Sequence, residues 1–313
     1  MRVLEIEAVD YHTAGEPFRI VTGQELRGRT ILEKRRDASE RLDHLRRLLV
    51  NEPRGHADMY GCFVTEPEDD GADLGVVFFH NAGYSTACGH GTIALVTWAL
   101  DRGLIAGPRV VVDVPSGRLE TEARVRDGRV RSVRFRNVPS FVLRRDAIPG
   151  IDIAFGGAFY ASVEERVSPA ELPRLIERGR ELKRELEANG EIVHPLEPEL
   201  RDVYGVIFWQ REGDNVQRNV TVFADGEVDR SPCGSGTSAR LALLDASREL
   251  PRGEELRHLS IVGTEFRGRV VGDAEVAGLP AVITEVEGSA HRTGEHRFVL
   301  EDADDLGTGF LLR

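Results

Sequence analysis

A short cysteine-containing segment occurs twice in this chain, once in each half. CGHGTIA begins at Cys88 and CGSGTSA begins at Cys233, and the two segments share Cys, Gly, Gly, Thr and Ala without a gap. Each segment follows a strand-like run, LGVVFF or NVTVFA, and precedes a run of helix formers. The cysteines are 145 residues apart in a chain of 313. This spacing predicts two similar halves that face each other rather than a short-period solenoid.

The pattern of strands and helices predicts an α/β fold with two domains. We place an N-terminal domain at residues 1–147, completed by residues 295–313, and a C-terminal domain at residues 148–294. The boundary is drawn at Arg145–Gly150, where RRDAIPG has the polar and breaker residues of a linker. Two amphipathic helices are expected, one over about 39–50 and one that begins at the capping box of Ser168 and stops at Asn189.

The composition argues against nucleic acid and membrane partners. The formal net charge is −12 and no stretch combines basic residues with aromatic ones, so a phosphate backbone would be repelled. No apolar run approaches the roughly 20 residues that span a bilayer, and MRVLEIEAVDYH reads as a strand rather than a signal peptide. We therefore expect a cytoplasmic protein. Its three cysteines are expected to be reduced thiols.

The repeated loop favours acid/base chemistry at Cys88 and Cys233. A C-G-x-G-T turn that opens a helix leaves the first-turn amides free to bind an anion such as a substrate carboxylate. The amides and the helix dipole are expected to lower the cysteine pKa from about 8.5 toward neutrality. A single cysteine is more often a small buried hydrophobic residue. Two such cysteines in matching halves, however, would supply the base and the acid that inversion of a stereocentre requires.

Neighbouring residues in these segments have both structural and functional interpretations. His90 could cap a helix, but its place beside the carboxylate nest favours a substrate contact, and Ser235 is its counterpart. Asp229 could cap a turn or bind a substrate nitrogen. Cys62 has no glycine nest, so we interpret it as core packing.

No metal or cofactor motif competes with the two thiols. The nine histidines show no metal-binding spacing, and His291 and His296 are interpreted as surface residues. Pyridoxal phosphate requires a Schiff-base lysine, but the chain's two lysines, Lys34 and Lys183, lie in charged segments that we expect to be exposed. The glycine loops lack a P-loop lysine and the dinucleotide-binding pattern. We therefore expect a reaction without a cofactor in a site closed from water.

Five strings, matched in order along almost the whole chain, resemble the proline racemase family of proline racemases, 4-hydroxyproline 2-epimerases and trans-3-hydroxyproline dehydratases. The strings are HTAGEP from His12, EPRGHADMYG from Glu52, ACGHGT from Ala87, GGAFYA from Gly156 and DRSPCGSGTSAR from Asp229. The resemblance implies a diaminopimelate epimerase-like fold in which strands wrap around a central helix in each of two domains. It also implies an active site in the cleft between the domains and a homodimer.

The resemblance assigns roles to particular residues. It places the catalytic pair on Cys88 and Cys233, and the substrate nitrogen contact on Asp229. The carboxylate nests fall on Gly89, His90, Gly234 and Ser235, and the aromatic walls of the pyrrolidine ring on Tyr60 and Phe223. The Tyr60 hydroxyl would suit a hydroxyproline oxygen, which favours hydroxyproline over proline.

The branch of the family is indicated by the residue at the second cysteine position. Cysteine there resembles the racemases and epimerases, and threonine resembles the dehydratases; this chain has Cys233. VYGVIF, NVTVFAD and the closing FLLR nevertheless resemble the dehydratase branch. We predict a two-base 4-hydroxyproline 2-epimerase or proline racemase, with a trans-3-hydroxy-L-proline dehydratase as the alternative. A non-catalytic amino-acid-binding protein is a third possibility.

Overall fold

The computed structural model describes residues 3–312, which form eighteen strands and five α-helices. The strands of the first half are β1 (Val3–Thr13), β2 (Glu16–Val21), β3 (Tyr60–Thr65), β4 (Leu74–His80), β5 (Gly83–Tyr84), β6 (Arg109–Val114), β7 (Gly117–Arg126), β8 (Arg129–Arg136) and β9 (Ser140–Ile148). Those of the second half are β10 (Ile151–Phe155), β11 (Phe159–Glu164), β12 (Val203–Gly213), β13 (Val216–Phe223), β14 (Glu227–Asp229), β15 (Leu256–Leu259), β16 (Glu265–Val276), β17 (Leu279–Gly288) and β18 (Ala290–Glu301). The helices are α1 (Ile31–Arg41), α2 (Asp43–Val50), α3 (Gly89–Asp101), α4 (Leu172–Ala188) and α5 (Gly234–Ser247), and a short 3-10 turn, η1 (Pro169–Glu171), precedes α4.

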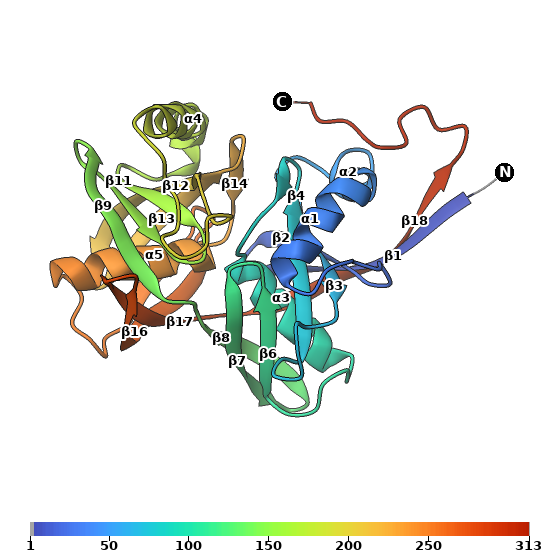
Figure 1. Cartoon of the computed structure of the whole chain (residues 1–313), viewed down its shortest axis with the longest axis horizontal. Helices are drawn as coiled ribbons and strands as arrows, with labels where there is room; N and C mark the ends of the chain where they lie inside the picture. Colours follow the sequence, from blue (N-terminus) through green and yellow to red (C-terminus); the bar gives the residue numbers. More distant parts are fainter. Residues whose placement is uncertain (1–2, 313) are drawn as a thin grey trace.

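The elements form two lobes (Figure 1). One lobe holds α1–α3, β1–β8 and β18, and the other holds α4, α5 and β9–β17. Hydrogen bonds between β8 and β17 join the strands of both lobes into one sheet. The chain crosses to the second lobe between β8 and β9 and returns between β17 and β18. The predicted domain limits at 147 and 294 stay a prediction, and the strand pairings place these crossings at 137–139 and 289.

The segment interpreted as a linker is part of the sheet. Arg145 lies in β9, and Pro149 and Gly150 form the turn of a hairpin in which Ile148 pairs with Ile151. The linker interpretation was wrong because Pro and Gly also favour tight turns between strands. Their presence in a sequence therefore does not distinguish a linker between domains from a hairpin turn.

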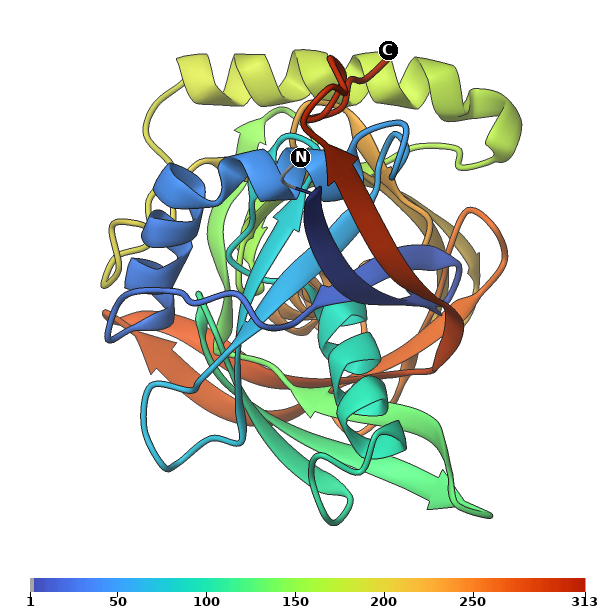
Figure 2. The ribbon, with the colours of Figure 1, turned by 90° about the vertical axis from the view of Figure 1, so that its right-hand side faces the viewer.

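A buried helix lies at the centre of each lobe. In α3 the residues from Gly89 to Ala99 are buried, and the helix contacts β1, β2, β3, β7, β8 and β18. In α5 the residues from Gly234 to Leu244 are buried, and this helix contacts β9, β10, β11, β16 and β17. Both helices are apolar on most sides, which suits burial by surrounding strands. Figure 2 shows α3 enclosed in this way.

The first and last strands of the chain pair with each other. β1 forms an antiparallel ladder with β18 that runs from Val3 opposite Glu301 to Thr13 opposite Ala290, and β1 pairs with β2 on its other side. Figures 1 and 2 show the two strands side by side. The last segment of the chain is therefore a structural part of the first lobe.

The helix expected over 39–50 begins earlier and is broken. Thr30 caps α1 through the amide of Glu33, and the Glu33 carboxylate accepts the amide of Thr30 in return. Leu42, with φ −114° and ψ 8°, separates α1 from α2. The prediction missed this start because a capping box lies outside the apolar stripe that the periodicity detects. The helix expected from Ser168 is confirmed as η1 and α4.

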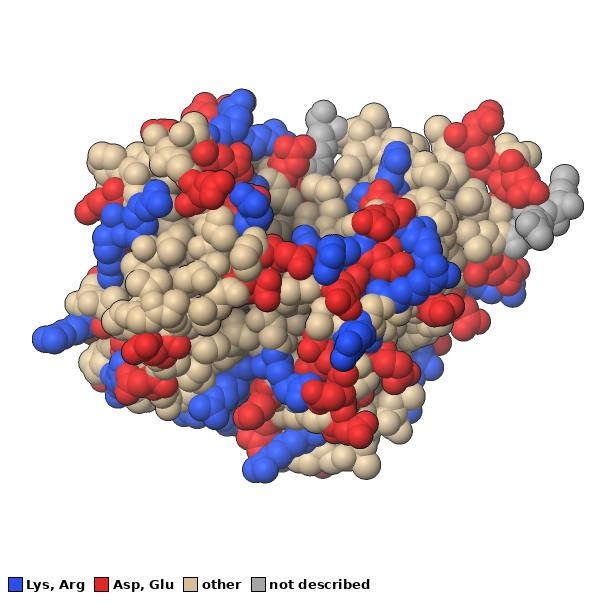
Figure 3. Space-filling model, in the orientation of Figure 1, with Lys and Arg blue, Asp and Glu red and all other residues tan. Residues whose placement is uncertain are grey.

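Charged residues of both signs are interspersed on the face shown in Figure 3, which is hollowed between the lobes. No helix within residues 3–312 is long and apolar enough to cross a membrane.

Candidate active site

The N-termini of the two central helices meet face to face. Gly89, the first residue of α3, lies so close to Gly234, the first residue of α5, that a Cβ built on Gly89 would be 2.5 Å from the Gly234 Cα. A Cβ on Gly234 would in turn be 2.7 Å from the Gly89 Cα. Only glycine permits this approach at both positions. The first-turn amides of the two helices, which have no partner within a helix, therefore converge on one place.

Both cysteines line a small cavity at this meeting point. The nine residues named from the sequence all line it, namely Cys88, Cys233, Gly89, His90, Asp229, Gly234, Ser235, Tyr60 and Phe223. Four further lining residues were not singled out: Ala87, Tyr160, Thr221 and Tyr204. Ala87 and Tyr160 lie within the strings that carry the family resemblance, and Tyr204 and Thr221 within VYGVIF and NVTVFAD. Those strings were therefore the sequence signal from which the four further lining residues could have been identified.

Cys88 is the N-cap of α3. Its backbone is extended, with φ −152° and ψ 97°, and its sulfur accepts the amide hydrogen of Gly91 at 3.2 Å. The sulfur also lies 3.4 Å from Nε2 of His90. Cys88 is thus fixed by its own helix and contacts an imidazole that can exchange protons.

Cys233 precedes α5 in a different conformation. Its φ is 61°, in the left-handed region that non-glycine residues seldom adopt. Its amide donates to the Ser231 hydroxyl at 3.1 Å, and its thiol donates to the Tyr160 hydroxyl oxygen at 3.7 Å. Strained backbone of this kind is concentrated at functional sites. The repeated sequence therefore gives two thiols on one cavity with unlike surroundings.

The expected lowering of the thiol pKa is not found. Burial raises the pKa of Cys233 to about 12, and the charge of Asp229 raises it further, while the amide of Gly236 acts in the opposite direction. Burial also raises the pKa of Cys88 well above its ordinary value, and the amide of Gly91 opposes this. The prediction counted the nest and the helix dipole but not the loss of water around the sulfur.

Asp229 presents a fixed carboxylate to the cavity. One oxygen accepts the amide of Ser231 at 2.8 Å, and the other lies 3.7 Å from Nδ1 of His90. All three residues are buried. Because His90 also contacts Cys88, a chain of polar groups runs from the carboxylate to that sulfur. A cationic nitrogen of a ligand would find its counter-charge at Asp229.

A second buried carboxylate, from the opposite lobe, holds the segment that carries Asp229. Glu16 in β2 accepts the amide of Arg230 at 2.7 Å, and Asp58 lies 3.3 Å from the Arg230 guanidinium. Burial and the charge of Asp229 raise the pKa of Glu16 well above its ordinary value. These contacts connect HTAGEP to DRSPC across the two lobes.

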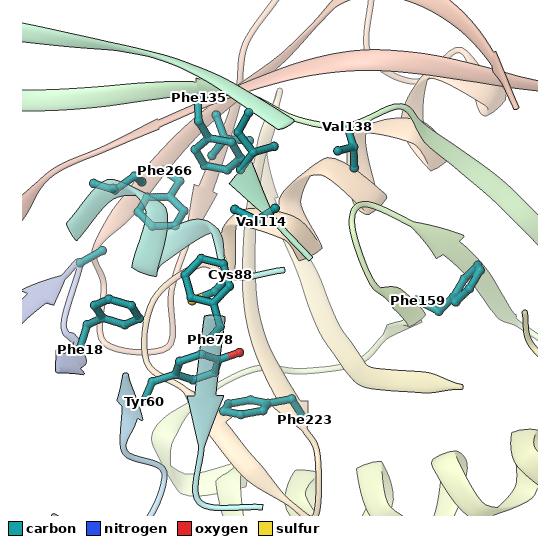
Figure 4. Close-up of a cluster of buried hydrophobic side chains, with 14 of the residues drawn as sticks. Phe18, Tyr60, Phe78, Cys88, Val114, Phe135, Val138, Phe159, Phe223 and Phe266 are labelled. Carbon is teal, nitrogen blue, oxygen red and sulfur yellow. The ribbon is translucent and has the colours of Figure 1, made fainter. Parts of the chain in front are cut away.

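Aromatic rings form one wall of the cavity. The Tyr60 ring meets the edge of His90 at 4.9 Å and lies 5.8 Å from Phe223. Figure 4 shows Tyr60 and Phe223 below Cys88, with Phe18 to their left and Phe78 between Cys88 and Tyr60. Burial of a Phe side chain contributes about 1.5–3 kcal/mol to folding, so these rings also stabilise the core beside the cavity. The wall suits the flat apolar face of a small ring.

Hydroxyl groups form the other wall. The Tyr60 hydroxyl donates to Ser85 and lies 2.9 Å from the Tyr204 hydroxyl, and the Tyr160 hydroxyl lies 2.6 Å from Ser235 Oγ. The Ser235 side chain thus positions Tyr160, while its backbone belongs to the nest. Burial raises the pKa of Tyr60, Tyr160 and Tyr204 well above the usual range, so these groups remain protonated.

The other residues considered from the sequence lie outside the cavity. Cys62 is fully buried in β3, as expected for core packing, and His291 and His296 are exposed. Lys34 was expected to be exposed but is buried, and its ammonium donates to the carbonyl of Glu66 at 2.5 Å. Lys183 is half-buried and bonds carbonyl oxygens beside the cavity. Charged sequence neighbours did not reveal this burial because a long lysine stem packs while its head finds carbonyls.

Comparison with known proteins places this site in a family. The family described as proline racemase matches residues 8–311. The chain is 45% identical to a trans-3-hydroxy-L-proline dehydratase of Bacillus cereus, over 100% of both chains. It is also 45% identical to a 3-hydroxyproline 2-epimerase of Burkholderia multivorans, over 98% of each. A hydroxyproline epimerase of Agrobacterium vitis with bound trans-4-hydroxy-L-proline superposes with a TM-score of 0.91 at 32% identity, over 98% of this chain and 96% of that one. The chain therefore belongs to the proline racemase family, as an enzyme that acts on amino acids.

Proposed function

We propose that this enzyme inverts the α-carbon of a hydroxyproline without a cofactor, with Cys88 and Cys233 as its acid and base. The observation that carries the proposal is the meeting of two helix N-termini at Gly89 and Gly234, which leaves both thiols on one buried cavity. Inversion requires a base on one face of the carbon and an acid on the other. If the chain divides into the two domains predicted from the sequence, each domain supplies one of the two thiols.

The substrate carboxylate binds the free amides at the start of α3 and α5, where both helix dipoles favour negative charge. The ring nitrogen, in its cationic form, pairs with Asp229. This pairing offsets the negative charge that raises the pKa of both thiols. We therefore expect one thiol to ionise when the substrate is bound rather than in the empty enzyme.

The chemical step is a proton exchange at one carbon. One thiolate removes the α-proton, and the electron pair left on carbon is stabilised by the carboxylate held at the nests. The opposite thiol then donates its proton to the other face, becomes the thiolate and leaves the first sulfur protonated. The two sulfurs exchange roles in the reverse direction, so their titration belongs to the pair.

A hydroxylated ring is favoured by the hydroxyl groups in the cavity. Tyr60, Tyr160, Tyr204 and Thr221 place four side-chain hydroxyls around a space that also has an apolar wall. A ring hydroxyl would find hydrogen-bond partners there. The relatives' names support both the 3- and the 4-hydroxy isomers.

The second candidate is dehydration of trans-3-hydroxy-L-proline, which the Bacillus cereus relative favours. Elimination needs one base to remove the α-proton while the 3-hydroxyl leaves as water, and the product rearranges to a cyclic imine. Because the second face of the carbon is not used, this reaction would require Cys88 and not a thiol at Cys233. The presence of a cysteine at position 233 favours inversion.

The test follows α-proton exchange in deuterium oxide by NMR with L-proline, trans-4-hydroxy-L-proline and trans-3-hydroxy-L-proline. Inverted product with one deuterium at the α-carbon and no loss of water is expected. Formation of imine from the 3-hydroxy isomer alone would overturn the proposal in favour of dehydration. A Cys62→Ala variant is the control, since that thiol lies in the core outside the cavity.

A further inference from the structure

A second pocket adjoins the catalytic cavity. It has a volume of about 360 Å³ and is lined by both lobes, including Arg35, His80, Ser85, Lys183 and Tyr204. Tyr204 lines both this outer pocket and the catalytic cavity. A larger space of about 830 Å³ lies elsewhere along the cleft, but its lining shares no residue with the cavity. Within residues 3–312, Tyr204 is therefore the side chain that the walls of the outer pocket and the cavity have in common.

Tyr204 is also the point at which the cavity wall is accessible. Of the thirteen residues that line the cavity, twelve are buried and Tyr204 is partly exposed. Its ring stacks on Phe223 with centroids 5.5 Å apart and meets the edge of Tyr160 at 5.8 Å. A rotation of this one side chain would connect the cavity with the outer pocket.

Different hydrogen bonds hold the hydroxyl of Tyr204 and its backbone. Its hydroxyl lies 2.9 Å from the Tyr60 hydroxyl, which in turn bonds Ser85 in the wall of the outer pocket. Lys183 donates to the carbonyl of Tyr204 at 3.2 Å. The backbone is thus fixed from α4. The ring is retained by its contacts with Phe223 and Tyr160 and by a neutral hydrogen bond at its hydroxyl, which itself contributes about 0.5–1.5 kcal/mol.

Arg35 gives the outer pocket a site for an anion. Its Nη2 donates to the carbonyl of Tyr84 at 2.8 Å, but its Nε is buried with no hydrogen-bond partner. The Glu199 carboxylate and the Tyr60 hydroxyl both interact electrostatically with this guanidinium, but neither is bonded to Nε. Other charged groups of the pocket are acidic or already engaged: Glu187, Glu199, Asp202 and Asp225, with Arg201 paired to Asp202 at 3.7 Å. A carboxylate is the group that the free Arg35 donor would take.

We propose that the outer pocket is the access route for a zwitterionic cyclic amino acid, that Arg35 binds the carboxylate of this amino acid first, and that the Tyr204 side chain is the gate to the thiols. The identity of the ligand rests on the proposed function. The route itself does not, because it follows from the shared wall. Passage through the gate breaks the Tyr60–Tyr204 hydrogen bond and leaves the paired charges between the lobes in place.

The route is tested with two alkylating reagents of similar size, neutral iodoacetamide and anionic iodoacetate. The rates of modification of Cys88 and Cys233 are measured by peptide mass spectrometry at a fixed alkaline pH. We expect Glu187→Trp, which places an indole in the outer pocket, to slow both reagents by about tenfold. Tyr204→Phe should speed both by about fivefold, as expected for loss of one hydrogen bond.

The control for steric blocking is Glu275→Trp, because Glu275 is an equally exposed glutamate that lines the larger space instead. Its alkylation rates should equal those of the wild type. Equal slowing by Glu187→Trp and Glu275→Trp, or none by Glu187→Trp, would overturn the route and indicate access by separation of the lobes.

The anion site is tested with Arg35→Gln. This variant should slow iodoacetate by about tenfold, the lower end of the range for electrostatic steering, and leave iodoacetamide unchanged. Arg36→Gln is the matched control, since Arg36 is the next residue of α1 but lines the larger space and not the outer pocket. Parallel slowing of both reagents by Arg35→Gln would refute an anion site. Alkylation needs no turnover, so these results stand even if the NMR experiment shows dehydration or no reaction.

Discussion

Substitution of Gly89 by alanine tests the contact between the two helix N-termini. The new methyl group would lie 2.5 Å from the Gly234 Cα, about 0.9 Å closer than the 3.4 Å at which ordinary contact begins, and 2.9 Å from a ring carbon of Phe135. The nearest atoms are backbone, which cannot rotate away. The helices must therefore separate by close to 1 Å, and the two thiols would separate with them.

The expected costs follow from this displacement. Overpacking of a core costs about 1–3 kcal/mol, and the better helix propensity of alanine offsets up to about 1 kcal/mol of it. A misplacement of about 1 Å in a catalytic constellation lowers the rate by about a hundredfold. We therefore expect Gly89→Ala to unfold a few degrees lower and to lose about a hundredfold in kcat.

The assay is α-proton exchange by NMR together with thermal unfolding. Gly272→Ala is the control, because a Cβ at Gly272 meets nothing nearer than 3.7 Å. Wild-type kcat and melting temperature in Gly89→Ala would refute the contact between the helix termini. A lowered melting temperature with unchanged kcat would show that the contact does not position the thiols.

Three further predictions concern titration and the two thiols. Cys88→Ser and Cys233→Ser should each reduce inversion by at least about a thousandfold, because a hydroxyl is a far weaker acid/base group; loss of inversion in Cys233→Ser with retained imine formation would identify the dehydratase. In the empty enzyme, alkylation of Cys233 should keep rising with pH toward its pKa of about 12, and a plateau near neutrality in the rate profile would contradict the effect of burial. Burial lowers the pKa of His258 from 6.5 to about 3. The Nδ1 atom of this histidine lies 2.8 Å from the Thr237 hydroxyl oxygen. Because the unfolded chain binds that proton first, stability should fall by about 4 kcal/mol as the pH drops from 6.5 to 3. Urea unfolding at stepped pH should show this slope, and His258→Gln should lack it.

The sequence predicted the site more fully than its chemistry. The gap-free repeat located α3 and α5 and paired Cys88 with Cys233, because glycine at a helix start leaves a recognisable pattern. The tyrosines of the cavity were missed, since Tyr160 and Tyr204 lie in strands whose residues alternate between faces, and alternation does not say which face meets a site. The direction of the thiol pKa was wrong because burial depends on groups far apart in the chain, and local sequence reports only the nearby amides.

The pairing of β1 with β18 has a consequence for how the protein is made. β1 leaves the ribosome long before β18, so one edge of β1 stays without its partner strand until β18 has been synthesised. Such a long sequence separation makes this ladder slow to close. An unpaired strand edge is also prone to association with other chains. Nascent chains of this enzyme are therefore expected to need protection by chaperones until β18 has been made, and a truncation that removes β18 would expose that edge permanently.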